Sequence, residues 1–327
     1  MKAVVITRNG PPEVLQLQEV ADPRIGDDGV LVRIRAAALN RADLLQRKGL
    51  YPAPPGTPQD IPGLEFAGEV ESLGEGVADW KKGDRVMGLV PGAGYAEKAA
   101  CHPLLLLPIP SNLSFEEAAC VPEAFLTAYD ALFRRLRLSI GEDLLIHAVG
   151  SGVGLAAVQL AKAAGARVFG TAGQDWKLEK AGSLGLDVAI NYQRQDFCET
   201  VSASTKGRGV DLILDLVGAD YWDRNVRALA EKGRIVLIGL LSGSETSIDL
   251  RGLMSKRLQV TGSVLRSRTL LEKADLTAEF RARVLPLLES GELTPNLDRA
   301  YALEDAAAAH RFMEENRNCG KIVLKLA

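Results

Sequence analysis

The hydrophobic residues of the chain follow two different patterns. In roughly the first 120 residues, short runs rich in β-branched side chains stand between glycines and prolines, which is typical of β-strands. The predicted strands are residues 3–6, 15–20, 30–38 and 66–73. Five prolines from Pro52 to Pro62 exclude helix and central strand, so this stretch is predicted to be an extended loop. A helix is predicted to begin at Ser114, with Glu116 and Glu117 in its first turn.

The pattern changes near residue 123, where short apolar runs begin to alternate with helical stretches. The predicted strands are residues 144–148, 167–171, 188–191, 210–216 and 234–238. The predicted helices between them are residues 153–164, 176–184, 197–205 and 221–229. Strands that alternate with helices form a parallel, doubly wound sheet, so an α/β fold is predicted for this region. The remaining chain is predicted to form helices at residues 276–290 and 303–315 and a closing strand at residues 321–326.

Length and charge narrow the class of protein. At roughly 150 residues per domain, 327 residues correspond to about two domains. The formal net charge of −3 argues against a protein that mainly binds nucleic acid or an anionic membrane. No apolar run approaches the roughly 18 residues of a membrane span, and the first segment turns polar after Ile6, so it lacks the core of a signal peptide. We therefore expect a cytoplasmic protein.

Cysteine and histidine are too scattered for a metal site. The cysteines contain no C-x-x-C pair, which argues against a structural zinc lobe or a redox dithiol. The three histidines are also far apart in the sequence. We therefore predict no bound metal and four reduced, mostly buried thiols, at Cys101, Cys120, Cys198 and Cys319.

A glycine-rich turn follows the first strand of the alternating region. The strand ends at Ala148, then Gly150, Gly152 and Gly154 follow, and a helix begins at once. Glycine lets the backbone turn tightly and lets a pyrophosphate approach, and the helix N-terminus offers unpaired N–H groups to the phosphates. The strand–helix setting predicts a dinucleotide-binding site. The alternative is a tight turn packed against the sheet.

The residues at the end of the next strand indicate whether a site prefers NAD or NADP. NAD sites commonly place a carboxylate there for the ribose 2′-hydroxyl. This strand ends at Thr171–Ala172–Gly173 without one, and Asp175 lies beyond its end. Lys177 follows shortly and Tyr192 follows the third strand, so both can reach a 2′-phosphate. We therefore predict NADPH as the cofactor; the alternative for Lys177 is a solvated helix residue.

Several segments together resemble a known family. They are ALNRADLLQRKGLY (38–51), GLEFAGEVESLGEGV (63–77), GDRVMGLVPGAGYAE (83–97), VPEAFLTAYDAL (121–132), IHAVGSGVGLAAVQLAKAAGA (146–166), GVDLILDLVG (209–218), VLRSR (264–268) and NCGKIVL (318–324). The chain resembles the zinc-independent, zeta-crystallin-like quinone oxidoreductases of the medium-chain dehydrogenase/reductase superfamily. Within them it is most similar to the branch whose human member is induced by a tumour suppressor.

The resemblance implies a fold, an activity and an assembly. It implies a GroES-like (chaperonin-10-like) β-barrel substrate domain of residues 1–122, completed by residues 265–327, and a Rossmann NADPH-binding domain of residues 123–264, with the active site in the cleft between them. It implies hydride transfer from NADPH to a small-molecule quinone without zinc, and a homodimer formed through the Rossmann domains. No partner protein is predicted.

Two departures from the zinc-dependent alcohol dehydrogenases of the superfamily support the absence of zinc. Those enzymes have a cysteine ligand where this chain has Asn40, and a histidine in a Gly-His-Glu segment where it has Leu64. Leucine cannot ligate a metal, and an asparagine carbonyl is a poor zinc ligand. Without a Lewis acid alcohol oxidation is difficult, whereas a quinone is already electrophilic.

The resemblance also assigns residues to the cofactor and to the reacting atoms. The expected cofactor contacts are Gly150, Ser151, Gly152 and Val153 at the pyrophosphate, Thr171, Gly173, Lys177 and Tyr192 at the 2′-phosphate, Gly239, Leu240, Ser263, Val264 and Leu265 at the nicotinamide end, and Asn318 on the phosphate side. The residues expected at the reacting atoms are Asn40, Asp43, Tyr51 and Thr127, of which Tyr51 and Thr127 also contact the cofactor. For Asn40 and Asp43 the alternative is a capped turn. None of these residues is an obvious general acid. We expect His147 to be a core residue and Asp215 a loop anchor.

Two other functions stay open at this point. A reductase of enones, enals or enoyl thioesters presents an electrophilic carbon to the same hydride, and Arg41, Arg47 and Lys48 are basic residues that a long coenzyme thioester would use. A non-catalytic, crystallin-like or RNA-binding role is the third possibility. The net acidity and the lack of aromatic–basic clusters count against RNA.

Overall fold

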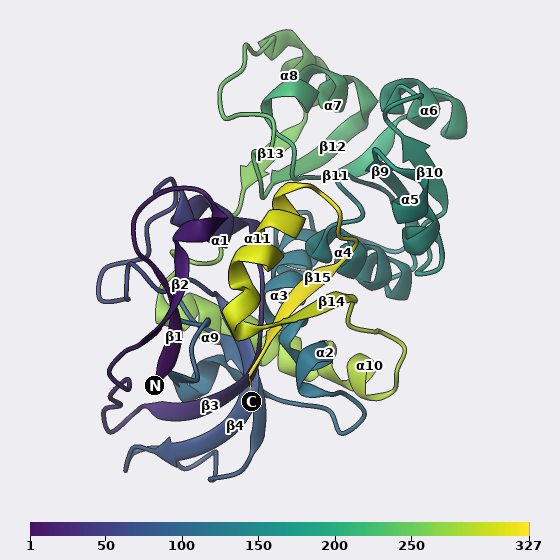
Figure 1. The fold of residues 1–327 in the computed structure, drawn as a ribbon. Coiled ribbons are helices and arrows are strands. Elements are labelled where there is room, and N and C mark those ends of the chain that lie inside the picture. Colours follow the sequence, from purple (N-terminus) through teal and green to yellow (C-terminus); the bar gives the residue numbers. More distant parts are fainter. Residues whose placement is uncertain (327) are drawn as a thin grey trace. The chain divides into compact units, whose positions relative to one another are not determined.

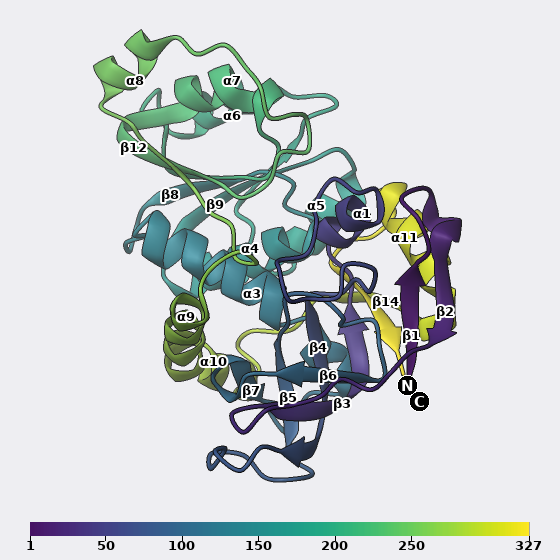
Figure 2. The same ribbon diagram turned by 90° about the vertical axis from the view of Figure 1, so that its left-hand side faces the viewer.

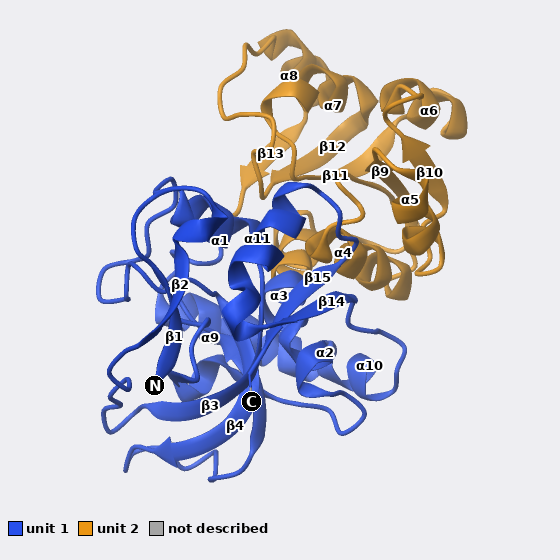
Figure 3. Ribbon diagram, viewed as in Figure 1, with its two compact units in different colours: residues 1–126, 265–327 blue, residues 127–264 orange. Residues whose placement is uncertain are grey.

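The computed structural model describes residues 1–326, and the chain forms two units (Figure 3). Unit 1 combines Met1–Leu126 with the segment that begins at Leu265, and unit 2 is Thr127–Val264. The division between Leu126 and Thr127 falls within helix α3 (Pro122–Tyr129).

Unit 2 is built on a six-stranded parallel sheet with helices on both faces (Figures 1 and 2). Its strands are β8 (Asp143–Ile146), β9 (Arg167–Ala172), β10 (Val188–Asn191), β11 (Val210–Asp215), β12 (Leu229–Leu237) and β13 (Gln259–Gly262). Their order across the sheet, β10-β9-β8-β11-β12-β13, is the doubly wound order of a Rossmann fold, so the predicted α/β class is confirmed. The helices of unit 2 are α4 (Gly152–Ala163), α5 (Asp175–Gly182), α6 (Phe197–Ser204), α7 (Trp222–Ala228) and α8 (Leu250–Lys256), with a π-helix at Asp130–Arg135 and a 3₁₀ helix at Ala219–Tyr221.

The central strands of this sheet are apolar on both faces. Leu144, Leu145 and Ile146 of β8 are all fully buried, as expected for a parallel strand covered by helices on each side. Phe169 of β9 and Phe197 of α6 belong to one buried cluster under the sheet. This rigid layer fixes the carboxyl ends of the strands, where ligands bind in this fold.

Unit 1 is a mainly antiparallel β-structure that joins the two ends of the chain. Its seven-stranded sheet contains β3 (Val30–Ala38), β4 (Glu65–Leu73), β5 (Arg85–Leu89), β6 (Lys98–Cys101), β7 (Leu106–Pro108), β14 (Leu297–Ala302) and β15 (Lys321–Lys325), and β1 (Lys2–Ile6) pairs with β2 (Leu15–Glu19). Strand β15 is antiparallel to β3, with Val323 opposite Ala38. The helices are α1 (Arg41–Arg47), α2 (Phe115–Ala119), α9 (Leu270–Arg283), α10 (Leu285–Glu289) and α11 (Ala306–Glu314), with 3₁₀ helices at Pro12–Val14, Pro103–Leu105 and Leu303–Asp305. The C-terminal segment thus completes the sheet that the N-terminal residues begin.

Several elements differ from the prediction for local reasons. The helix predicted at residues 276–290 is two helices, α9 and α10, and Pro286, which has no N–H to donate, stands in the first turn of α10. Helix α9 also begins earlier, because Thr269 and Glu272 form a capping box at its N-terminus. The predicted start of α2 at Ser114 is confirmed by the same type of cap with Glu117. Helices α1 and α8 and the strands β5, β6, β7, β13 and β14 were not predicted.

No helix within residues 1–326 is long and apolar enough to span a membrane.

Candidate cofactor site and active site

The glycine-rich turn connects β8 to the N-terminus of α4. Ser151 caps this helix, since its Oγ accepts a hydrogen bond from the Gly154 N–H at 3.0 Å. A Cβ atom on Gly154 would lie 2.6 Å from the Val149 carbonyl oxygen, so only glycine fits there. Gly152 and Val153 in the first turn are half-buried. The turn therefore presents backbone N–H groups and the positive end of a helix of 12 residues, which is a site for phosphate.

Lys177 and Tyr192 lie beside the glycines of neighbouring strand ends. A Cβ atom on Gly150 would lie 3.0–3.1 Å from the aliphatic stem of Lys177, so the stem rests on the turn. The Lys177 ammonium is 5.2 Å from the centroid of the Trp176 ring. A Cβ atom on Gly173 would lie 2.6 Å from the Tyr192 hydroxyl oxygen. The ends of β8, β9 and β10 thus carry an ammonium and a hydroxyl group suited to a second phosphate.

The carboxylate of Asp175, at the start of α5, is bound to two side chains, one at the end of β10 and one after it. It accepts hydrogen bonds from Asn191 Nδ2 at 2.7 Å and from Arg194 at 2.5 Å. The Asn191 hydrogen bond and the nearby Arg194 charge hold the pKa of Asp175 below its usual value. An ionised carboxylate paired in this way is poorly placed to accept a ribose hydroxyl group. The prediction overlooked Arg194, which adds a second cation after β10.

Thr171 lies in the interior of unit 2 rather than at its surface. The residue is fully buried at the end of β9, and its hydroxyl is hydrogen-bonded to His147 Nδ1 at 3.0 Å. His147 is fully buried and its Nε2 lies 2.7 Å from Asn225 Oδ1, which agrees with the predicted core role. Burial lowers the pKa of His147 to about 4, so the ring is neutral at neutral pH. The predicted contact of Thr171 with the 2′-phosphate gains no support from this placement.

Asp215 anchors the loop after β11, as predicted. Its carboxylate accepts hydrogen bonds from the N–H groups of Val217 at 2.7 Å and Gly218 at 3.2 Å, and from Asn225 Nδ2 at 3.0 Å. These bonds hold the loop at the same sheet edge as the glycine-rich turn.

The residues predicted at the nicotinamide end follow β12 and β13. Gly239 lies against Leu216, where a Cβ atom would approach the carbonyl oxygen to 2.9 Å, and Leu240 is 54% exposed. Ser263 Oγ donates to Asp130 Oδ2 at 2.9 Å. Val264 is 52% exposed. Both loops leave the carboxyl ends of parallel strands, the edge that also carries the glycine-rich turn. Thr127 is half-buried on α3.

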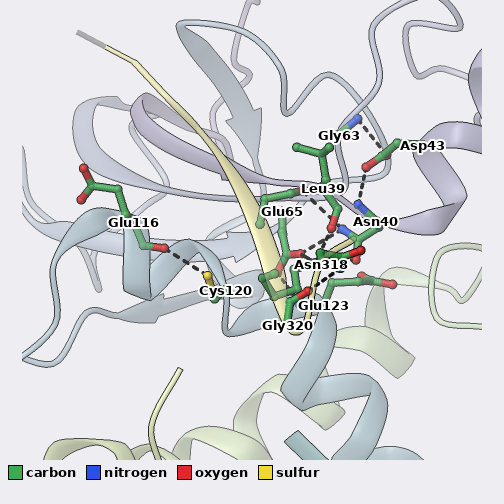
Figure 4. A network of polar contacts seen from close by, with 12 residues as sticks. Leu39, Asn40, Asp43, Gly63, Glu65, Glu116, Cys120, Glu123, Asn318 and Gly320 are labelled. Atoms are coloured by element: carbon green, nitrogen blue, oxygen red, sulfur yellow. Dashed lines mark hydrogen bonds and ion pairs between the residues drawn. The ribbon is translucent and has the colours of Figure 1, made fainter. Parts of the chain in front are cut away.

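In unit 1, Asn40 belongs to a buried polar cluster with Glu65 and Lys321 (Figure 4). Lys321 Nζ lies 2.6 Å from Glu65 Oε1, 2.7 Å from Asn40 Oδ1 and 2.6 Å from the Leu39 carbonyl oxygen. Asn40 Nδ2 donates to Glu65 Oε1 at 2.9 Å. The ammonium group of β15 is therefore surrounded by three oxygens from β4 and the start of α1.

This donor set does not fit a zinc ion. The Asn40 oxygen is occupied by the Lys321 ammonium, and Leu64 is an apolar side chain that is 2% exposed. Within residues 1–326, no three His, Cys, Asp or Glu side chains come together as metal ligands. The cation that these oxygens surround is the protein's own lysine.

Asp43 is hydrogen-bonded to Asn40, a member of the same buried polar cluster. It is fully buried and accepts hydrogen bonds from the Asn40 N–H at 2.7 Å, the Tyr95 hydroxyl at 3.0 Å and the Gly63 N–H at 3.2 Å. Burial raises the pKa of Asp43 to about 6, although these hydrogen bonds act to lower it. Because Asp43 accepts from the N-cap of α1 and has no exposed surface, its placement favours the capped turn over contact with substrate.

Tyr51 lies beside a buried arginine that the prediction did not assign to the site. The Arg266 guanidinium is 5.1 Å from the centroid of the Tyr51 ring. It donates to the Pro91 carbonyl oxygen at 2.7 Å, to Gln46 Oε1 at 2.7 Å and to the Tyr51 carbonyl oxygen at 3.3 Å. Arg266 therefore fixes the loop around Tyr51 at the edge of the proline-rich segment.

A small pocket lies next to these residues within unit 1. Its lining residues are Leu64, Leu89, Val90, Pro91, Leu105, Glu123, Leu265, Arg266 and Lys273. Leu265, predicted at the cofactor, lies in its wall. Asn318, also predicted at the cofactor, donates to the Gly320 carbonyl oxygen at 2.8 Å and shapes the turn before β15 (Figure 4).

Sequence reasoning missed Glu123, Arg266 and Lys321. The signal for Lys321 was a lysine at the start of an otherwise apolar strand, and the signal for Glu123 was a carboxylate directly after Pro122. Neither signal identifies a partner, because the partners come from distant parts of the chain.

Two family models match the chain. Residues 26–129 match "Alcohol dehydrogenase GroES-like domain", which confirms the GroES-like prediction for unit 1, and residues 152–289 match "Zinc-binding dehydrogenase". A quinone oxidoreductase of Pseudomonas aeruginosa is 34% identical over 328 residues, which cover 99% of this chain and 99% of that protein.

Solved structures have the same fold. Quinone oxidoreductase of Escherichia coli, solved in complex with NADPH, is 32% identical with a TM-score of 0.89 and covers 100% of both chains. A structure of an NAD-dependent alcohol dehydrogenase is 35% identical with a TM-score of 0.90 and also covers 100% of both chains. Membership of the branch with the tumour-suppressor-induced human member stays a prediction. The chain belongs to the quinone oxidoreductase family of the medium-chain dehydrogenases/reductases.

Proposed function

We propose that this protein reduces quinones by hydride transfer from NADPH and that it does so without zinc. The observation that carries the proposal is the set of groups around the glycine-rich turn of unit 2. Lys177 rests on Gly150, Tyr192 lies on Gly173, and Asp175 is paired with Arg194. This arrangement supplies positive charge to a 2′-phosphate and withholds the carboxylate that a 2′-hydroxyl would need. The solved E. coli relative in complex with NADPH supports the same cofactor.

In this proposal unit 2 binds and orients the dinucleotide. The N–H groups at Ser151, Gly152 and Val153 bind the pyrophosphate, and Lys177 and Tyr192 bind the 2′-phosphate. The loops at Gly239–Leu240 and Ser263–Val264 line the nicotinamide end, and we assign Thr127, Leu265 and Asn318 to further cofactor contacts. When bound, NADPH supplies the hydride; the protein supplies position and an electrostatic environment.

Unit 1 would contact the acceptor through Tyr51 and Arg266. The Tyr51 ring is half-buried, and Arg266 holds it from one side. The donor set at Asn40 and Leu64 supports a reaction that needs no Lewis acid. A quinone fits this environment because it is electrophilic without metal activation, whereas an alcohol is not.

Cofactor binding and turnover together test the proposal. Quenching of tryptophan fluorescence, titrated with NADPH and with NADH, should show tighter binding of NADPH. Steady-state assays with NADPH should show turnover of ortho- and para-quinones at higher kcat/KM than of enones. Equal affinity for the two nucleotides would refute the cofactor assignment, and turnover of enones alone would refute the acceptor. Metal analysis of active enzyme should find no stoichiometric zinc.

We further propose a cytoplasmic homodimer. Within residues 1–326 the cysteines at 101, 120, 198 and 319 form no disulfide bond, as is common in a reducing compartment. Strand β13 ends the sheet of unit 2 and carries the exposed Val260, and the adjoining α8 exposes Leu250 and Met254. Such a sheet edge can pair with a second copy. Sedimentation of the purified protein should give twice the mass of the chain, and a monomer at micromolar concentration would overturn this assignment.

A further inference from the structure

Glu123 is a carboxylic acid at the start of α3 whose backbone is held by the buried cluster of unit 1. Its N–H donates to Glu65 Oε2 at 2.8 Å, and the other oxygen of Glu65 contacts Asn40 and Lys321 (Figure 4). The first turn of α3 is therefore fixed to strands β4 and β15. A side chain on so rigid a base has a defined position, which a group that transfers a proton requires.

The Glu123 side chain faces the pocket of unit 1. It is the one acidic residue in a wall that is otherwise apolar, apart from two cations, Arg266 and Lys273. Both cations are bound to other atoms: Arg266 donates to the Pro91 carbonyl oxygen and Gln46, and Lys273 Nζ donates to the Arg266 carbonyl oxygen at 2.7 Å. Within residues 1–326, no side chain forms a hydrogen bond or ion pair with the Glu123 carboxyl group. A half-buried acid without such a partner keeps its proton available to a ligand.

The charges around this group favour the protonated form. Burial raises the pKa of Glu123 to about 8, and the charges of Glu65 and Asp43 add to that effect. Lys321 and Lys273 oppose it without cancelling it. The remaining groups that face Glu123 are Tyr51 and Arg266; burial raises the pKa of the Tyr51 phenol, so it stays neutral as well. At neutral pH the pocket thus contains a neutral carboxylic acid.

We propose that Glu123 is the proton donor to the acceptor in this reductase. The inference rests on the proposed function, since it requires an acceptor that gains negative charge on oxygen. Hydride from NADPH brings two electrons to the acceptor and leaves NADP⁺. The Glu123 O–H bond breaks as the O–H bond of the reduced acceptor forms, and the electron pair stays on the Glu123 carboxylate. A hydronium ion or buffer acid from the solvent then returns a proton to Glu123, so each turnover consumes one NADPH and one proton.

Two quinones of nearly equal size test this role. The reduced form of tetrachloro-1,4-benzoquinone is a much stronger acid than that of tetramethyl-1,4-benzoquinone, so it needs a proton donor far less. Glu123→Gln keeps the size of the side chain but cannot donate in this way. We expect kcat to fall on the order of 100-fold for the tetramethyl quinone and less than about 10-fold for the tetrachloro quinone. Wild-type kcat with the tetramethyl quinone should fall above pH of about 8, and this decrease should be absent in the variant.

Equal losses for the two quinones, or the same alkaline decrease in both proteins, would overturn the assignment. Glu123→Asp, which keeps an acid, should recover part of the rate with the tetramethyl quinone, and Glu289→Gln on exposed surface should leave both rates unchanged. NADPH binding by fluorescence should be unaltered in every variant. If Glu123→Gln does not fold, the wild-type enzyme still decides: its tetramethyl-to-tetrachloro rate ratio should fall above pH 8, and a constant ratio overturns the role. If wild-type enzyme reduces neither quinone with NADPH, the proposed function itself fails.

Discussion

Each unit contains a lysine with a distinct environment, and the two environments differ in exposure and in the origin of the neighbouring residues. In unit 2, Lys177 is half-buried beside a backbone turn, and its neighbours follow one another along successive strand ends. In unit 1, Lys321 is buried, and its partners Asn40 and Glu65 are separated from it by most of the chain. The first lysine is the one that we assign to the cofactor, and the second forms its contacts inside the fold. In the proposed function the same residue type therefore selects a cofactor in one unit, whereas in the other it stabilises the native structure.

The largest effect is expected from removing the buried lysine. Lys321→Met leaves the buried Glu65 carboxyl group without its cation, which costs about 3–5 kcal/mol of unfolding free energy. Denaturation by urea measures this loss. Lys325→Met on the same strand removes a surface pair with Glu116 and should cost about 1 kcal/mol or less. Equal losses of unfolding free energy in the two variants would contradict the larger contribution that we assign to the buried pair.

A buried acid of unit 1 gives the next largest effect, and it depends on pH. The pKa of Asp43 in the folded protein is raised to about 6, so the native state holds this proton more tightly than the unfolded chain does. Lowering the pH from 7 to 4 therefore stabilises the wild type, and Asp43→Asn lacks this gain. The difference in unfolding free energy between wild type and variant should grow by up to about 3 kcal/mol over this range. Denaturation curves at four pH values measure it; a constant difference would contradict the prediction.

The lysine of unit 2 should affect affinity rather than stability. Lys177→Glu removes an ammonium from the 2′-phosphate and adds repulsion, so NADPH should bind roughly 10–100-fold more weakly. Affinity for NADH should stay within about twofold, because that nucleotide has no 2′-phosphate. Lys180→Glu on the exposed face of the same helix is the control and should leave both affinities unchanged. Unchanged NADPH affinity in Lys177→Glu would refute the assignment of this lysine.

The smallest effect concerns the backbone of the turn. Gly154→Ala places a Cβ atom 2.6 Å from the Val149 carbonyl oxygen, and the shift that relieves this contact should cost about 1–3 kcal/mol and weaken NADPH binding. Gly182→Ala at the end of α5 meets no atom within 4 Å and should be neutral or slightly stabilising. Thermal unfolding in the presence and absence of NADPH compares the two. Equal unfolding temperatures of Gly154→Ala and Gly182→Ala, with and without NADPH, would mean that the turn has room for a side chain.

The sequence predicted the features that depend on neighbouring residues. The strand–helix alternation of unit 2, the turn from Gly150 to Gly154 and the cap at Ser114 all follow from local patterns, and the structure has them. Fold class was accessible because buried parallel strands are apolar along their whole length. Lys177 and Tyr192 could be predicted to lie beside the strand ends, because a doubly wound sheet brings successive strand ends to one edge.

The features that were missed depend on residues far apart in the chain. Nothing near Glu65 indicates that its cation comes from Lys321, and nothing near Glu123 indicates that Glu65 binds its N–H group. Strands β5, β6 and β7 were missed because short antiparallel strands interrupted by glycine and proline have weak patterns. The resemblance assigned Thr171 to the cofactor, and only tertiary structure reveals that its hydroxyl binds His147.

The pairing of β15 with β3 also has a consequence for biosynthesis. Unit 2 is one continuous segment, so all of its strands are available once residue 264 has left the ribosome. Unit 1 cannot complete its fold before β15 is synthesised, because until then β3 lacks one of its neighbouring strands and Glu65 lacks its cation. Domains commonly fold in the order of synthesis, from the N-terminus onward. In this chain the middle is able to mature first, and a nascent chain stalled before Lys321 should contain a folded nucleotide-binding unit beside an incomplete barrel.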